Sequence, residues 1–150
     1  MLDKEAAKQE LKKLIARYEA AVAESKVKQY NEERTKKDFI LPLFKILGWA
    51  TETEEVTAED KVSKGRVDYG FRINELLKLV VEAKPLRADL DKPEYAQQAV
   101  DYAWHKGISW AVLTNFEKII LFNADLKLQN PLQNAKLRLS CSQFLDRFED

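Results

Sequence analysis

The run from Leu76 to Val81 is almost entirely apolar and leads directly into two charged residues, Glu82 and Lys84. A largely apolar stretch of this length, closed by Pro85, indicates a single buried strand. Side chains alternate between the two faces of a strand, so Glu82 and Lys84 should point the same way. Because a carboxylate and an ammonium are costly to remove from water, their place on a buried strand requires partners or a function.

A second candidate strand, residues 66–73, carries another acidic residue, Asp68, fourteen positions before Glu82. The Asn74-Glu75 pair between the two strands is typical of a tight turn and predicts an antiparallel hairpin. Asp68 would then meet Glu82 and the lysine at one end of a sheet. Two carboxylates beside a lysine suit a hard divalent cation next to a positive charge, which is the equipment for phosphodiester hydrolysis. A buried salt-bridge network without catalytic role is the structural alternative.

Composition limits the class of protein. A length of 150 residues with 45% hydrophobic content predicts one globular domain with a real core. Lys+Arg and Asp+Glu both number 25, so the formal net charge is zero and any contact with nucleic acid must come from local patches. The single cysteine, Cys141, excludes an intramolecular disulfide, and the single histidine, His105, excludes the usual Cys/His zinc site. Without a signal peptide or a long apolar run, we expect a soluble, cytoplasmic protein that does not contact membranes.

Two helical patterns occupy the N-terminal third of the chain. Residues 2–28 show amphipathic periodicity, and the pattern returns over about residues 31–48. Pro42 either kinks this second helix or moves its start to Thr35, where Thr35-x-x-Asp38 resembles a capping box.

The rest of the chain alternates between strand and helix patterns. Residues 51–60 are predicted as an edge strand or a surface loop, and 61–65 as a loop. The C-terminal half predicts a helix, three short strands, a loop and a last amphipathic helix, in the following ranges: helix 93–106, strands 108–113 and 118–122, loop 126–134, strand 137–139, and a helix begun by Ser140 or Ser142 and still running at Asp150.

Asp68 followed by Glu82-Ala83-Lys84 resembles the PD-(D/E)XK nuclease signature, with Val67-Asp68 in place of its Pro-Asp. Further motifs occur around this signature in an order and spacing similar to the N-terminal endonuclease domain of type IIG restriction-modification enzymes, and more distantly to the nuclease domain of type I restriction subunits. The similarity covers roughly residues 30–125. The motifs are Phe39-Ile40-Leu41-Pro42-Leu43, Leu47-Gly48-Trp49, Val67-Asp68-Tyr69, Gln98-x-x-x-Tyr102-Ala103-Trp104 and Leu113-Thr114-Asn115-Phe116-Glu117.

The resemblance implies an α/β fold of the restriction-endonuclease-like kind, with a mixed central sheet flanked by helices. We expect a single nuclease domain over residues 1–150, in which 1–29 form an N-terminal helical extension and 30–125 form the nuclease core. Residues 126–150 would form a strand and a helix that lead into a further domain outside this chain.

The resemblance also implies roles for the residues at the end of the two strands. Asp68 and Glu82 would bind Mg²⁺, for which Mn²⁺ would substitute, and the main-chain carbonyl of Ala83 would be a further ligand. Lys84 would polarise the attacking water or stabilise charge on the phosphate. Glu32 matches an upstream helical glutamate that stands near the metal.

Four residues outside this cluster are further candidates: Gln98 as a catalytic residue, and Gln98, Tyr102, Lys64 and Arg66 as possible DNA contacts. Gln98 and Tyr102 lie one helical turn apart and match an element thought to position DNA or the catalytic lysine, although a helix face packed on the sheet is the structural alternative. Lys64 and Arg66 lead into Asp68 and could contact phosphates, or they could simply belong to a solvated loop.

The function that the resemblance implies is that of a magnesium-dependent deoxyribonuclease of the type II restriction endonuclease class, acting on double-stranded DNA in a prokaryotic cytoplasm. A covalently linked methyltransferase and a target-recognition region would lie outside this chain, because Asn130-Pro131-Leu132 does not match the Asn-Pro-Pro-Tyr motif of adenine methyltransferases. A transient dimer on DNA would allow both strands to be cut. Two alternatives are a non-catalytic DNA-binding or scaffolding module with a degenerate nuclease fold, and a stand-alone repair or junction nuclease.

Overall fold

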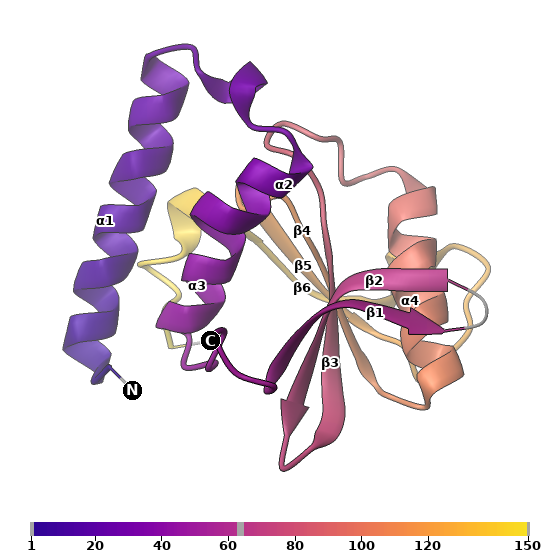
Figure 1. The fold of residues 1–150 in the computed structure, drawn as a ribbon. Helices are drawn as coiled ribbons and strands as arrows, with labels where there is room; N and C mark the ends of the chain where they lie inside the picture. The colour runs from indigo at the N-terminus through magenta and orange to yellow at the C-terminus, as the bar shows by residue number, and fades with distance from the viewer. Residues whose placement is uncertain (1, 63–64, 150) are drawn as a thin grey trace.

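The computed structural model describes residues 2–62 and 65–149, without the side chains of residues 59–62, 65 and 66. Within these residues, six strands form one sheet in which the strands lie in the order of the sequence (Figure 1). Neighbouring strands are antiparallel except β3 and β4, which are parallel. The strands are β1 (Val56–Val62), β2 (Gly65–Ile73), β3 (Leu76–Ala83), β4 (Trp110–Thr114), β5 (Lys118–Asn123) and β6 (Ala135–Ser140).

Helices cover both faces of the sheet, as Figure 1 shows. Helix α4 (Pro93–Lys106) connects the parallel strands β3 and β4, which a hairpin cannot join, and packs on one face. Helices α1 (Lys4–Ala23) and α3 (Leu41–Ile46) lie on the other face. Each face has its own apolar cluster beneath its helices. The predicted mixed sheet with flanking helices is therefore confirmed.

The hairpin between β2 and β3 forms at the predicted turn. Asn74 and Glu75 have φ angles of 50° and 68°, the left-handed conformation that a tight two-residue hairpin turn requires. The register pairs Tyr69 with Val81, so Asp68 and Glu82 occupy the next positions along the two strands. The hairpin thus brings the two acidic residues to the same end of the sheet.

The second helical segment is continuous but irregular. It runs through α2 (Glu32–Thr35), a π-helical turn η2 (Lys36–Ile40) and α3. In the π turn the Leu41 N–H donates to the Lys36 carbonyl, one residue further back than in an α-helix. This turn stands directly before Pro42, whose nitrogen has no hydrogen to donate.

The helical segment begins near residue 31, and not at Thr35 as one of the two predictions had it. Asn31 is the N-cap, because its side chain accepts a hydrogen bond from the Arg34 N–H at 2.9 Å. Thr35 lies inside the helix, where its hydroxyl donates to the Asn31 carbonyl at 2.8 Å and accepts from the Leu86 N–H at 3.2 Å. The start at Thr35 is therefore wrong.

Most other elements fall close to their predicted ranges. The 51–60 segment contains an edge strand, and β1 continues to Val62, inside the segment predicted as a loop. Helix α1 ends at Ala23, before Ser25 with a φ angle of 56°, and is followed by a short 3₁₀ turn, η1 (Val27–Gln29). A second 3₁₀ turn, η3 (Pro131–Asn134), occupies the end of the predicted loop.

The predicted C-terminal helix is wrong over the described residues. Ser140 forms a capping box, but it begins only a 3₁₀ turn, η4 (Cys141–Gln143), and the chain continues in turns to residue 149. The buried ring of Phe144 lies 5.8 Å from that of Phe116, measured between centroids. Phe144 is thus packed against the core from a segment of turns, a tertiary contact that the helical pattern does not specify. Among the described residues, no helix combines the length and the apolar character needed to cross a membrane.

Candidate metal and catalytic site

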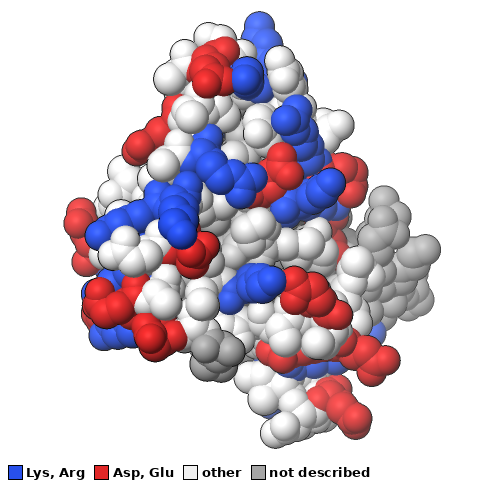
Figure 2. Space-filling view, turned by 60° about the vertical axis from the view of Figure 1, so that its left-hand side comes forward, with Lys and Arg blue, Asp and Glu red and all other residues white. Residues whose placement is uncertain are grey.

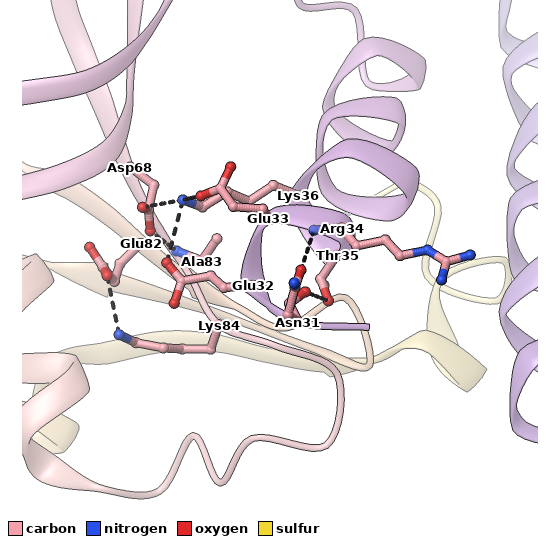
Figure 3. Close-up of polar contacts among 10 residues, drawn as sticks. All are labelled: Asn31, Glu32, Glu33, Arg34, Thr35, Lys36, Asp68, Glu82, Ala83 and Lys84. Atoms are coloured by element: carbon pink, nitrogen blue, oxygen red, sulfur yellow. Dashed lines mark hydrogen bonds and ion pairs between the residues drawn. The ribbon is translucent and has the colours of Figure 1, made fainter. Parts of the chain in front are cut away.

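Three carboxylates from three elements meet at the end of strand β3. Glu32 on α2, Asp68 on β2 and Glu82 on β3 each place one oxygen within 4.8 Å of the other two (Figure 3). Glu82 and Asp68 approach because of the hairpin register, and Glu32 approaches because α2 lies over the same end of the sheet. The structure thus brings together the three acidic side chains that the sequence singled out.

Asp68 is oriented by the main chain of the neighbouring strand. Its Oδ2 atom accepts a hydrogen bond of 2.7 Å from the Ala83 N–H, and its Oδ1 atom lies 2.6 Å from Nζ of Lys36. Ala83 therefore contributes to the site through its N–H, while the predicted role of its carbonyl as a metal ligand stays a prediction. Both oxygens of Asp68 are fixed before any ligand arrives.

Glu82 is the most deeply buried acid of the group. Its side chain is 4% exposed, and its Oε1 atom lies 3.3 Å from Nζ of Lys84. The other oxygen, Oε2, is buried and has no hydrogen-bond partner among the described residues. Burial, and then the charge of Asp68, raise the pKa of Glu82 to about 8, although Lys84 opposes the shift.

Lys84 points to the same side as Glu82, as the strand alternation predicted. Besides its contact with Glu82, its Nζ atom lies 4.3 Å from the ring centroid of Tyr95, on helix α4. An ammonium over an aromatic face is stabilised by the ring quadrupole. Tyr95 therefore helps to hold Lys84 in the site, a contact that the sequence reasoning did not anticipate.

A second lysine in the site, Lys36, was also missed. Its Nζ atom lies 2.6 Å from Asp68, 3.0 Å from Glu33 and 3.4 Å from Glu32, and its side chain is only 8% exposed. Burial of the ammonium opposes its charge, but hydrogen bonds to Asp68 and Glu33 prevail and raise the pKa of Lys36 above its ordinary value. The sequence does contain a feature that indicates burial of Lys36. The lysine precedes Phe39 by three residues and Ile40 by four, and therefore lies on the apolar side of the helical pattern.

The predicted DNA contacts lie in different surroundings. Gln98 is exposed on α4, whereas Tyr102 is buried in the apolar cluster beneath that helix. Tyr95, Gln98 and Tyr102 follow one another at helical spacing along one side of α4. Lys64 lies outside the described residues, and so does the side chain of Arg66.

The residues of this site fit a hard divalent cation. All candidate ligands are carboxylate oxygens, from Glu32, Asp68 and Glu82, and the ammonium groups of Lys36 and Lys84 contact them. The unpartnered oxygen of Glu82 is a buried acceptor that a cation would satisfy. An incomplete set of carboxylates is what Mg²⁺ prefers, since it keeps several waters or substrate oxygens.

The fold defines the class of this chain: it is an α/β domain of the restriction-endonuclease-like kind. Two solved structures share it. A fragment assigned as the HsdR subunit of a type I restriction enzyme from Vibrio vulnificus YJ016 matches with a TM-score of 0.57 and 24% identity, over 79% of this chain and 25% of that chain. The type IIG restriction endonuclease BpuSI matches with a TM-score of 0.53 and 20% identity, over 75% of this chain and 15% of that chain.

Sequence comparison gives a particular relative. The chain is 28% identical over 161 residues to the type II restriction enzyme and methyltransferase RM.Eco57I of Escherichia coli. The match covers 95% of this chain but only 16% of that much longer protein. No family model matches the chain. The resemblance to the nuclease domains of restriction enzymes is thus confirmed.

Proposed function

We propose that the chain is a Mg²⁺-dependent endonuclease domain that hydrolyses phosphodiester bonds of double-stranded DNA, as the cleavage module of a restriction-modification enzyme. The observation that carries this proposal is the approach of carboxylate oxygens from Glu32, Asp68 and Glu82 to within 4.8 Å. Lys84 stands beside them, 3.3 Å from Glu82. The restriction-enzyme relatives support nuclease activity for a domain with this fold.

Each residue of the cluster has a role in this proposal. Asp68 and Glu82 would hold Mg²⁺ or Mn²⁺, with Glu32 and the carbonyl of Ala83 as further ligands. Such an ion supplies Lewis-acid chemistry, because it acidifies water and neutralises charge on a phosphate. Asp68 needs little reorganisation, since the Ala83 N–H already orients its carboxylate. Lys84, held near Glu82 and over an aromatic ring, can donate to a phosphate oxygen as negative charge develops there.

The surface charge suggests that DNA is recognised with help from outside this chain. The formal net charge is zero, and Figure 2 shows lysine and arginine side chains interspersed with aspartate and glutamate over the face that it displays. Such a mixed surface gives little general attraction to phosphates. The match covers only 16% of a relative named restriction enzyme and methyltransferase, and this supports our proposal that the chain works with a linked methyltransferase and a target-recognition region in a longer protein. Two such proteins would pair transiently on DNA to cut both strands.

Calorimetric titration with Mn²⁺ tests the metal site. We expect the wild-type chain to bind Mn²⁺ and Asp68→Asn to lose binding, because the amide cannot supply the missing charge. Asp125→Asn, which changes an exposed aspartate in the same way, is the matched control and should bind like the wild type. Circular dichroism checks that all three proteins are folded. A folded wild-type chain that binds no Mn²⁺ would instead favour the non-catalytic DNA-binding or scaffolding module.

A further inference from the structure

Lys36, in the π-helical turn η2, places its ammonium among the carboxylates of the candidate site. Its ammonium contacts Asp68 and Glu32, two of the three acids whose oxygens lie within 4.8 Å of one another. Figure 3 shows the lysine reaching from its helical turn toward Asp68, with Glu32 and Glu33 beside it. The cation that neutralises these carboxylates in the metal-free protein is therefore part of the chain.

The ammonium is well satisfied in this position. It has three N–H donors, and three carboxylates lie within 3.4 Å of Nζ. One of them, Glu33, has a side chain that is 80% exposed and is not among the three acids that could jointly hold a metal ion. Lys36 can consequently keep one partner at the rim of the site while it gives up Asp68 and Glu32, because its four-carbon stem is flexible.

We propose that Lys36 is a built-in counter-ion that competes with the divalent cation for Asp68 and Glu32, and that metal binding displaces its ammonium toward Glu33. This rests on the metal site proposed above. A divalent cation held by Asp68 and Glu32 would lie close to the ammonium that contacts both acids, and the repulsion between the two charges opposes their simultaneous binding. Lys36 thereby lowers the affinity for metal and keeps the acids together when no metal is bound.

Substitution of the lysine tests the competition. Lys36→Met keeps the apolar stem and removes the charge, so Mn²⁺ should bind roughly tenfold more tightly or better than to the wild type in calorimetry. Lys45→Met removes another lysine that pairs with a glutamate, Glu52 at 2.7 Å, but lies outside the cluster, and should leave the affinity unchanged. Equal or weaker binding by folded Lys36→Met would overturn the proposal.

A second measurement uses the wild-type chain and does not depend on the folding of a variant. Acetylation of lysines by a water-soluble reagent, followed by peptide mass spectrometry, should modify Lys36 slowly without metal and several-fold faster with saturating Mn²⁺. Lys45 should react at the same rate in both conditions. Mn²⁺ binding without any change at Lys36 would refute displacement while leaving the proposed nuclease site intact. If neither the wild type nor Lys36→Met binds Mn²⁺, both the metal site and the competition fail.

Discussion

At the scale of single residues, the two lysines of the site have different surroundings and should have separable effects. Lys84 contacts Glu82 and the ring of Tyr95, and it makes no described ion pair with Asp68 or Glu32. Because Lys84 contacts one proposed ligand and Lys36 contacts two, Lys84→Met should change Mn²⁺ affinity less than Lys36→Met does, but it should slow DNA cleavage by roughly 10²-fold, the scale of losing one preorganised contact to the transition state. Calorimetry and single-turnover nicking of plasmid DNA measure the two effects. Cleavage at the wild-type rate would reduce Lys84 to a structural ion pair.

Glu82 gives the metal-free protein a distinctive pH dependence. Its pKa is raised from 4.5 to about 8, first by burial and then by the charge of Asp68. Between these values the folded chain holds a proton that the unfolded chain has released, so stability falls as the pH rises through this window. Glu82→Gln removes the titration and should raise stability at pH 8 by on the order of 2 kcal/mol in EDTA. Thermal unfolding from pH 4 to 9 measures this, and a slope equal to that of the wild type would contradict the burial argument.

At the scale of elements, local rules account for the hairpin and for α4, but not for every helix end. Helix α4 has its predicted bounds because Pro93 begins it and Gly107, with a φ angle of 70°, ends it. The start at Thr35 failed because the π turn accommodates Pro42 within the helix. In place of the predicted C-terminal helix, a 3₁₀ turn leads to Phe144, whose packing on Phe116 is a tertiary contact that periodicity does not specify.

The sequence predicted the three acidic residues of the candidate site but not the lysine and the tyrosine that the helices bring to it. The proximity of Asp68 and Glu82 could be predicted from strand alternation and from the Asn74-Glu75 turn. Strand alternation and turn type depend on residues that are neighbours in the sequence. Glu32 came from the family resemblance. Lys36 and Tyr95 were missed because charged and aromatic residues on amphipathic helices are ordinarily assigned to solvent or to the core. Their contacts depend on how helices are placed against the sheet, which the sequence pattern does not specify.

The turn of the hairpin offers a test of element geometry. Glu75 has a φ angle of 68°, a conformation that glycine adopts without steric penalty. Glu75→Gly should therefore stabilise the chain by about 1 kcal/mol without altering Mn²⁺ binding. Glu75→Ala, which removes the same charge but keeps the Cβ atom, is the control and should give no such gain. Chemical denaturation of the three proteins measures the difference, and equal stability of the two variants would argue against strain at this turn.

At the scale of the whole molecule, the formal net charge of zero and the short span relative to a longer restriction enzyme both predict weak DNA binding by this chain alone. We expect the purified chain to nick supercoiled plasmid slowly with Mg²⁺, without sequence preference, and less at moderate salt than at low salt. A single site cuts one strand at a time, so nicked circles should precede linear product. Efficient linearisation at one sequence by this chain alone would favour a stand-alone nuclease.

The hydroxyl of Thr35 links the helix that carries Glu32 to the chain just beyond β3, through the Asn31 carbonyl and the Leu86 N–H. A residue that is not itself a candidate ligand thus ties the helix of Glu32 to the chain that follows the strand of Glu82. Mg²⁺ requires short contacts of about 2.0–2.1 Å, whereas Ca²⁺ accepts about 2.3–2.6 Å. Thr35→Val, which keeps the shape but loses the hydrogen bonds of the hydroxyl, should narrow the difference in affinity between Mg²⁺ and Ca²⁺ in calorimetry. Discrimination between Mg²⁺ and Ca²⁺ by ionic radius would then depend on one buried hydroxyl. If Thr35→Val and the wild type have the same ratio of Mg²⁺ to Ca²⁺ affinity, the hydroxyl has no such role.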